Sequence, residues 1–260
     1  MSDNKNSLVI TPIVGIGMIN KHDQIIPITL ACLDQMDVVI DDGDILVFTQ
    51  KIVSKSEGRV RYLSQYQPST QALSLAKLSG KDPRFVEAIL HESAEILRVK
   101  PGTIIAEHKN GFICANAGID HSNVFNTVGN QEEPILLLPE NPDLTAKQYQ
   151  FEVKNLTHRN IGILIIDSHG RAWRNGSIGM TIGLAGVPGV VDLRGHRDLF
   201  GYELRVTQTA AADQLAAAAS IKMGESDEGV PVVHVRGFPY ELRSSTMSEL
   251  IRDKKQDLFR

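Results

Sequence analysis

The chain has 260 residues, of which 42% are hydrophobic, 22% charged and 5% aromatic; this composition excludes collagen-like, disordered and disulfide-scaffold proteins. Its 27 Lys and Arg residues and 31 Asp and Glu residues give a net charge of −4, so it has no general attraction to nucleic-acid phosphates. The length suffices for one to two domains with a large core.

Apolar runs separated by turn residues predict strands in the first half of the chain. The stretch 82–100 predicts one amphipathic helix, because its apolar residues have helical spacing behind Asp82 as the cap and Pro83 at the first position. Lys109-Asn110-Gly111 predicts a tight turn between two strands. The strands expected here are 8–13, 45–48, 103–106, 112–115 and 135–138.

Strands and helices alternate in the second half, which makes a mixed α/β fold the expected class. The run 161–166 lacks polar alternation and predicts a central strand covered on both faces. The many glycines in 168–201 predict an irregular, functional loop region. The other expected elements are a helix at 144–157, an Ala-rich helix at 207–223 capped by Gly224, a strand at 230–235, and a polar tail from Arg243 with a minor helix.

Cys32 and Cys114 stand far apart among aliphatic or small residues, which is typical of buried packing thiols and not of a CxxC redox or zinc motif. We therefore expect a reducing, cytoplasmic location. The first residues, MSDNKNSLVI, lack a basic segment followed by a long apolar stretch, and no segment approaches the ~20 apolar residues that cross a bilayer. Neither export nor membrane insertion is expected.

Three acidic residues stand where regular structure is expected to end. Asp167 follows the central strand, at the edge where open α/β sheets bind ligands, and Asp120 also follows a strand. Glu225 lies beyond the Ala-rich helix, where a carboxylate is disfavoured by the helix dipole unless a cation offsets it. Oxygen ligands of this kind suit Mg²⁺ or Mn²⁺, so we predict that the three converge on one metal site. Caps and solvated turn residues are the alternative.

Two groups of basic residues are candidate anion-binding groups. Lys51, Lys55 and Arg59 follow a predicted strand and suit phosphate groups, although a solvated face is the alternative. A second group suits a phosphorylated or polycarboxylate substrate; the alternative is that it fixes the glycine-rich loop by pairing with Asp192 and Asp198. This second group consists of Arg171, Arg174, Arg194 and Arg197.

Several familiar catalytic motifs are absent from the sequence. Gly15-Ile16-Gly17 lacks the third glycine of a dinucleotide loop, and there is no GxxxxGKS. His91-Glu92 lacks the second histidine of a zinc helix, so we expect it on a solvated helix surface. No GxSxG elbow supports a triad hydrolase.

Six segments together resemble the coenzyme F420 γ-glutamyl ligase family over residues 12–237. They are, in order, GDILVFTQKIVSKSEGRV, CANAGIDHSNV, LLLPENPD, IIDSHGRAWRNGSIGMTIGLAG, DLRGHRDLFGYELRVTQTAAADQLAAAASIKMGE and DEGVPVVHVRG. The resemblance implies a single module at 1–243 with two intertwined lobes and mixed sheets, followed by a polar tail at 244–260. It also implies a homodimer with the nucleotide between the lobes.

The resemblance implies a GTP-dependent ligase that joins L-glutamate to the lactyl carboxylate of the F420 precursor and then adds γ-linked glutamates through an acyl phosphate. Two divalent ions, Mg²⁺ or Mn²⁺, are implied, with K⁺ as a further candidate ion. The implied catalytic residues are Lys55, Asp120 and Asp167, and the implied metal ligands are Asp120, Asp167, Ser168 and Glu225. The implied nucleotide contacts are Ile16, Gly17, Met18, Ile19, Gln50, Lys51, Lys55, Asn123, Met223, Gly224, Glu225, Ser226, Asp227, Glu228, Gly229 and Val230.

The chain departs from the family pattern at two places. Gly17 stands where the family often has Pro, and Gln50-Lys51 replaces a small hydroxyl pair. Two other functions stay open: a nucleotide- or metal-binding regulatory protein, and the same ligase chemistry on another carboxylate acceptor. Measuring GDP release with and without each acceptor distinguishes the three.

Overall fold

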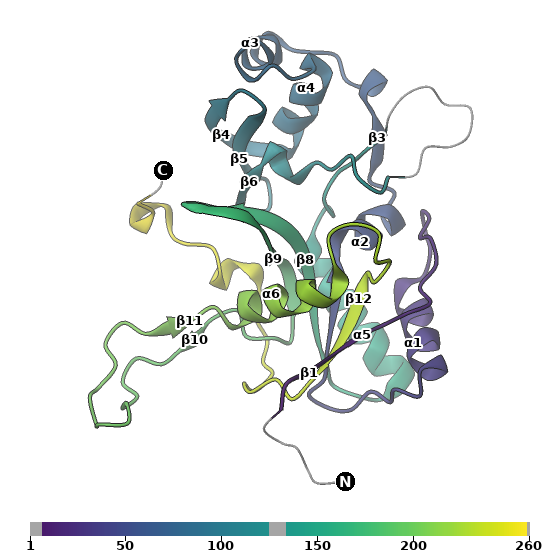
Figure 1. Cartoon of the computed structure of the whole chain (residues 1–260), viewed down its shortest axis with the longest axis vertical. Helices are drawn as coiled ribbons and strands as arrows, with labels where there is room; N and C mark the ends of the chain where they lie inside the picture. The colour runs from purple at the N-terminus through teal and green to yellow at the C-terminus, as the bar shows by residue number, and fades with distance from the viewer. Residues whose placement is uncertain (1–6, 125–133, 259–260) are drawn as a thin grey trace.

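A mixed sheet forms the centre of the molecule (Figure 1). The computed structural model describes residues 7–124 and 134–258. Strands β2 and β8 run parallel, and the other neighbours in this sheet run antiparallel. In spatial order the five strands are β1 (Val9–Pro12), β12 (Val232–Arg236), β2 (Ile45–Thr49), β8 (Gly162–Arg171) and β9 (Arg174–Ala185).

Side-chain alternation along these strands builds a core on each face of the sheet. In β8, Ile163 and Ile165 join one core, while Leu164 and Ile166 join the other. The run 161–166 is therefore buried on both faces, as its sequence predicts. The first core lies against α1 (Ile25–Gln35), α2 (Gln50–Ser56) and α5 (Pro142–Thr157), and the second against α6 (Ala211–Met223).

A smaller lobe is inserted between α2 and α5 and carries its own core. Arg59 lies at its base: it pairs with Glu92 at 2.6 Å and donates to the Leu138 carbonyl at 2.8 Å. Glu92 is thus buried, whereas the sequence predicted a solvated surface. The lobe contains β3 (Val60–Tyr62), a 3-10 turn (Leu63–Gln65), α3 (Thr70–Ser79), α4 (Pro83–Glu92), β4 (Ser93–Lys100), β5 (Thr103–His108), β6 (Ile113–Ala115), a 3-10 turn (Asn116–Gly118) and β7 (Pro134–Leu136).

The predicted fold class is confirmed, because helices and mixed sheets form two lobes that share one chain. The predicted turn at Asn110-Gly111 joins the antiparallel strands β5 and β6. Cys32 and Cys114 are free and buried, as predicted. Within the described ranges, no helix is both long and apolar enough to cross a membrane.

The helix predicted over 82–100 is wrong in its second half. Helix α4 ends at Glu92, and Ser93 turns the backbone to an extended conformation while its hydroxyl donates to the Ile89 carbonyl at 2.6 Å. Residues 93–100 then pair with β5 as strand β4. The apolar residues at 96 and 97 fit a helical period and a strand equally well, and the pairing partner decides between them.

The loop predicted over 168–201 is wrong up to residue 185. Strand β8 continues to Arg171, and β9 follows from Arg174 as its antiparallel partner. Two of the glycines permit close packing: a Cβ at Gly179 would lie 2.6 Å from the Ala216 carbonyl oxygen of α6, and one at Gly183 would lie 2.4 Å from Pro142 of α5. Glycine density here reflects helices lying close against a strand.

An arm extends from the main body (Figure 1), whereas the C-terminal tail packs against it. The arm runs between β10 (Val191–Asp192) and β11 (Gln208–Thr209). The tail has two 3-10 turns, Met247–Glu249 and Lys254–Gln256, in place of the predicted helix. It buries Met247 in the main core and places Lys254 Nζ 2.7 Å from Glu107 Oε2 of the smaller lobe. The division of the chain at residue 243 stays a prediction, and its ranges include residues outside those described.

A buried charge network closes the sheet at the start of β2. The Asp44 carboxylate, 2% exposed, accepts from His234 at 2.8 Å and from Arg236 at 2.6 Å. Burial alone raises the pKa of Asp44, but these hydrogen bonds outweigh it and lower the pKa from 3.8 to about 2. The resulting stability is present above pH 4 and is lost as pH falls through the folded pKa.

We expect Asp44→Asn to lower the free energy of unfolding at pH 7 by about 3 kcal/mol, because the buried His234 and the half-exposed Arg236 lose their anion. Urea unfolding at pH 7 measures this loss. Asp34→Asn, on the exposed face of α1, is the control and retains wild-type stability. A wild-type urea midpoint for Asp44→Asn would show that the network contributes nothing.

Candidate active site

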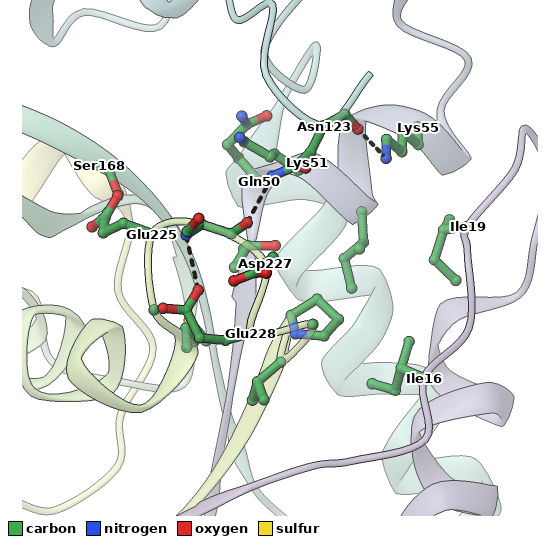
Figure 2. A pocket seen from close by; sticks show the side chains of 18 of the residues that line it. Ile16, Ile19, Gln50, Lys51, Lys55, Asn123, Ser168, Glu225, Asp227 and Glu228 are labelled. Atoms are coloured by element: carbon green, nitrogen blue, oxygen red, sulfur yellow. Dashed lines mark hydrogen bonds between the residues drawn. The ribbon is translucent and has the colours of Figure 1, made fainter. Parts of the chain in front are cut away.

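A cavity of about 720 Å³ opens where β2 ends (Figure 2). It is lined by all the residues for which the resemblance implied nucleotide contact, together with Asp167 and Ser168. Asp120 does not line the cavity, but it forms an ion pair with Lys51, and Lys51 does line it. The sequence therefore identified almost the whole wall of this cavity. It did not identify the remaining lining residues, Thr49, Ile52, Val124, Ile166, Ser220 and Pro231.

The main sheet brings the two central segments of the site together. Thr49, the last residue of β2, pairs with Ile166 of β8, and α2 begins immediately at Gln50. Asp167 is therefore the first residue of β8 beyond the end of its parallel partner. The prediction that the central strand ends at Asp167 is wrong, because β8 continues to Arg171, but Asp167 does lie where the parallel partner strand has ended.

The loop after α6 reaches the site because α6 packs closely on β9 at Gly179. Gly224 ends α6 with a positive φ of 75°, and a Cβ there would lie 2.0 Å from the Glu228 carboxyl carbon. Only glycine permits this turn. The turn places Glu225 so that Ser168 Oγ lies 2.8 Å from each of its carboxylate oxygens.

Asp120 is held by an ion pair and a hydroxyl. Its Oδ2 lies 2.8 Å from Lys51 Nζ, while its Oδ1 accepts from the amide and hydroxyl of Ser122 at 2.7 and 2.9 Å. Burial alone raises the pKa of Asp120, but the hydrogen bonds from Lys51 and Ser122 outweigh it and lower the pKa below its usual value. Sequence reasoning missed Ser122, which also accepts from Lys51 Nζ at 2.6 Å.

Lys55 links three segments across the cavity. Its Nζ donates to the Asn123 carbonyl at 2.7 Å (Figure 2). Asn123 Nδ2 in turn donates to the Ser226 carbonyl at 3.0 Å. Burial lowers the pKa of Lys55, and the charge of Lys51 lowers it further against the opposing effect of Asp120. Within the described chain Lys55 has no carboxylate in ion-pair contact, so its charge is available to an anion.

Gln50 offers a donor that no described residue satisfies. The side chain is 1% exposed, and its Oε1 accepts from the Ser54 hydroxyl at 2.9 Å. Its Nε2 has no hydrogen-bond partner among the described residues. Since buried amide donors are normally paired, this atom suits an acceptor atom of a bound molecule.

The predicted convergence of Asp120, Asp167 and Glu225 on one metal site stays a prediction. No group of three His, Cys, Asp or Glu residues in the described ranges is arranged to hold a metal ion. Asp167 and Ser168 are consecutive in a strand and so face opposite sides of β8. Asp167 contacts His169, whereas Ser168 contacts Glu225. The oxygen donors therefore form separate groups around the cavity.

The second basic group lies outside the cavity. Arg194 pairs with Asp192, which supports the structural alternative for that residue. Asp198 accepts instead from the backbone amides of Phe200 and Tyr202, both at 2.8 Å. Arg171 donates to the Gly176 carbonyl at 3.4 Å, within the turn of the β8–β9 hairpin. Acceptor binding by these arginines, Arg174 and Arg197 included, stays a prediction.

Comparison with known proteins identifies the family of this chain. A family model described as F420-0:Gamma-glutamyl ligase matches residues 14–237. The chain belongs to this family. The matched range contains every residue that lines the cavity, and it ends before the tail.

Three relatives show how far the likeness to this family extends. The chain is 43% identical over 221 residues to the coenzyme F420:L-glutamate ligase of Methanocaldococcus jannaschii, covering 85% of this chain and 86% of that protein. It is 42% identical over 251 residues to the enzyme of that name from Methanothermobacter thermautotrophicus, covering 96% and 95%. It is 39% identical over 249 residues to the one from Archaeoglobus fulgidus, again covering 96% and 95%.

Proposed function

We propose that this chain is a GTP-dependent ligase that joins L-glutamate to the lactyl carboxylate of the F420 precursor and then adds further glutamates through γ-linkages. Membership of the family supports glutamate ligation in F420 biosynthesis. The observation that carries the proposal is the cavity itself, whose wall contains two lysines together with carboxylate and hydroxyl groups.

A carboxylate is a poor electrophile at neutral pH, so amide formation needs activation by phosphate. The acceptor carboxylate oxygen attacks the γ-phosphorus of GTP, the bond to the β,γ-bridging oxygen breaks, and GDP leaves from an acyl phosphate. The glutamate amine then attacks the acyl carbon, the bond to the phosphate oxygen breaks, and inorganic phosphate and one proton leave. Catalysis of the first step consists mainly of positioning and electrostatic stabilisation.

The lysines of α2 provide that stabilisation. Lys55 has no carboxylate partner among the described residues and lines the cavity, so it stabilises charge on the phosphate that is transferred. Lys51 is held by Asp120 and Ser122 and provides a second, fixed positive charge. The Gln50 amide adds a neutral donor to the same wall.

The oxygen donors fit Mg²⁺ or Mn²⁺. Asp120, Asp167, Ser168 and Glu225 would hold the ions, with Ser168 and Glu225 already in contact with each other. A bound divalent ion neutralises phosphate charge and orients the attacking oxygen. Asp167 has a bond to His169 through Oδ2 only, which leaves Oδ1 available in the described structure. K⁺ binding stays a prediction without an assigned residue.

Measuring GDP release with and without acceptor tests the proposal. We expect repeated turnover of GTP to GDP only when Mg²⁺ or Mn²⁺, the F420 precursor and L-glutamate are all present, because the acyl phosphate forms without L-glutamate but needs it to react further. Nucleotide binding without release under any condition would favour a regulatory protein. Release that another carboxylate acceptor supports, but the F420 precursor does not, would favour the same chemistry on that acceptor. A parallel titration with ATP measures the preference for guanine.

We also propose that the protein forms a homodimer through the arm. Leu199 and Phe200 are 99% and 95% exposed, and Val206 is 84% exposed, on a segment that extends away from the core. Large apolar side chains gathered in this way are typical of protein interfaces.

We expect wild-type protein to have the mass of a dimer in light scattering. Phe200→Asp should weaken association by about 2 kcal/mol or more, because it places a charge where the dimer would bury an aromatic ring. Leu156→Asp, on an exposed position of α5, is the matched control and stays dimeric. A dimer of unchanged affinity in Phe200→Asp would exclude the arm as the interface.

A further inference from the structure

His169 lies behind the cavity wall rather than in it. It stands two residues after Asp167 in β8, so both side chains face the same side of the strand. Its ring is 6% exposed, and its Nε2 lies 3.1 Å from Asp167 Oδ2. A carboxylate can only accept, so Nε2 carries the proton of this hydrogen bond.

The smaller lobe fixes the His169 ring. Phe112 packs against it, with ring centroids 5.5 Å apart and planes tilted by 41°. Phe112 in turn stacks on His108 at 5.1 Å with an interplanar angle of 5°. His108 is itself held, because its Nδ1 accepts from the Asn110 amide at 3.0 Å. The turn between β5 and β6 therefore limits rotation of His169 away from Asp167.

Because of the His169 hydrogen bond, the two carboxylate oxygens of Asp167 have different surroundings. Oδ2 is bound to His169, and Oδ1 is the oxygen left for a molecule in the cavity, which Asp167 lines. Asp120 has a different support, since Lys51 and Ser122 hold it from the cavity side. Without His169, the Asp167 carboxylate could rotate about its side-chain bonds, and its orientation would no longer be fixed.

We propose that His169 is a positioning residue that holds the Asp167 carboxylate with one oxygen directed at the divalent ion of the ligase reaction. The inference rests on the proposed function, because it assumes that Asp167 is a ligand to that ion. Histidine and carboxylate groups behind a metal ligand commonly have this role, and their loss typically weakens metal binding about tenfold to a hundredfold.

The test compares His169→Phe with His169→Gln. Phenylalanine keeps the ring contact with Phe112 but has no N–H, while glutamine keeps an N–H near the position of Nε2. Mn²⁺ binding is followed by electron paramagnetic resonance in the presence of GDP. We expect His169→Phe to weaken Mn²⁺ binding about tenfold to a hundredfold and His169→Gln to recover most of it. We also expect kcat to fall with little change in the KM for GTP.

His91→Phe is the matched control, since His91 Nε2 lies 3.3 Å from the Glu87 carboxylate, in a pair that is outside the cavity. We expect His91→Phe to bind Mn²⁺ with wild-type affinity. Should His169→Phe not fold, Phe112→Leu loosens the ring while keeping the N–H, and we expect a smaller weakening in the same direction. Wild-type Mn²⁺ affinity in folded His169→Phe or in Phe112→Leu overturns the inference. Failure of wild-type protein to bind Mn²⁺ at all would instead overturn the proposed metal role of Asp167.

Discussion

Asp167→Asn is expected to lower kcat by at least about a hundredfold at saturating Mg²⁺ or Mn²⁺ and to leave the fold intact. Asn keeps the shape of Asp and can accept from His169, but it removes the negative charge that a divalent ion requires. Asp167 lines the cavity and is the first residue of β8 beyond the end of its parallel partner β2. Steady-state rates of GDP formation across a metal titration measure the effect.

The control for this variant is Asp34→Asn, which makes the same chemical change on the exposed surface of α1. It retains wild-type kcat and metal dependence. Unfolding curves for both variants distinguish loss of the site from loss of the fold. If Asp167→Asn is folded and turns over at close to the wild-type rate with either ion, Asp167 is not a metal ligand in this reaction.

Lys55→Met is expected to lower kcat by about a hundredfold to a thousandfold, which is typical when a charge-stabilising donor is removed from a transition state. Methionine keeps the apolar stem but removes the ammonium, which donates to the Asn123 carbonyl. Because burial lowers the pKa of Lys55, we also expect wild-type activity to decline at a lower pH than an ordinary lysine would give. Rates of GDP formation measured from neutral to alkaline pH give both quantities.

Lys154→Met, an exposed lysine in the last turn of α5, is the control for Lys55→Met and keeps the wild-type rate and pH profile. A second comparison is Lys51→Met, which also leaves Asp120 without its cation. A kcat within a few fold of wild type in Lys55→Met would exclude Lys55 from charge stabilisation.

The sequence predicts most strands because local patterns determine them, and the family resemblance names most of the residues that line the cavity. The run 161–166 could only be a strand covered on both faces, and the position of Gly224 after an Ala-rich helix predicts the turn that carries Glu225. Errors arose where tertiary contacts decide the local structure. Residues 93–100 became a strand because β5 is their partner, and Gly179 belongs to a strand because α6 lies against it.

Long-range pairing explains what sequence reasoning missed in the site. Lys51 and Asp120 are far apart in the chain, and no local pattern shows that they form an ion pair at 2.8 Å. The predicted convergence of the three carboxylates stays a prediction, and the strand period shows only that the consecutive residues Asp167 and Ser168 face opposite sides of β8. The same period of two places His169 beside Asp167.

Transfer of oxygen-18 from the acceptor is the most direct test of the ligase mechanism. The F420 precursor, labelled with oxygen-18 in its lactyl carboxylate, is incubated with the protein, GTP, Mg²⁺ and L-glutamate, and both products are analysed by mass spectrometry. An acyl phosphate predicts glutamylated product and inorganic phosphate that contains one labelled oxygen atom for each first glutamate joined to the lactyl carboxylate, whereas every later γ-linked addition releases unlabelled phosphate. Glutamylated product with no label in the phosphate would contradict the mechanism, and GDP formation without glutamylated product would contradict the proposed function.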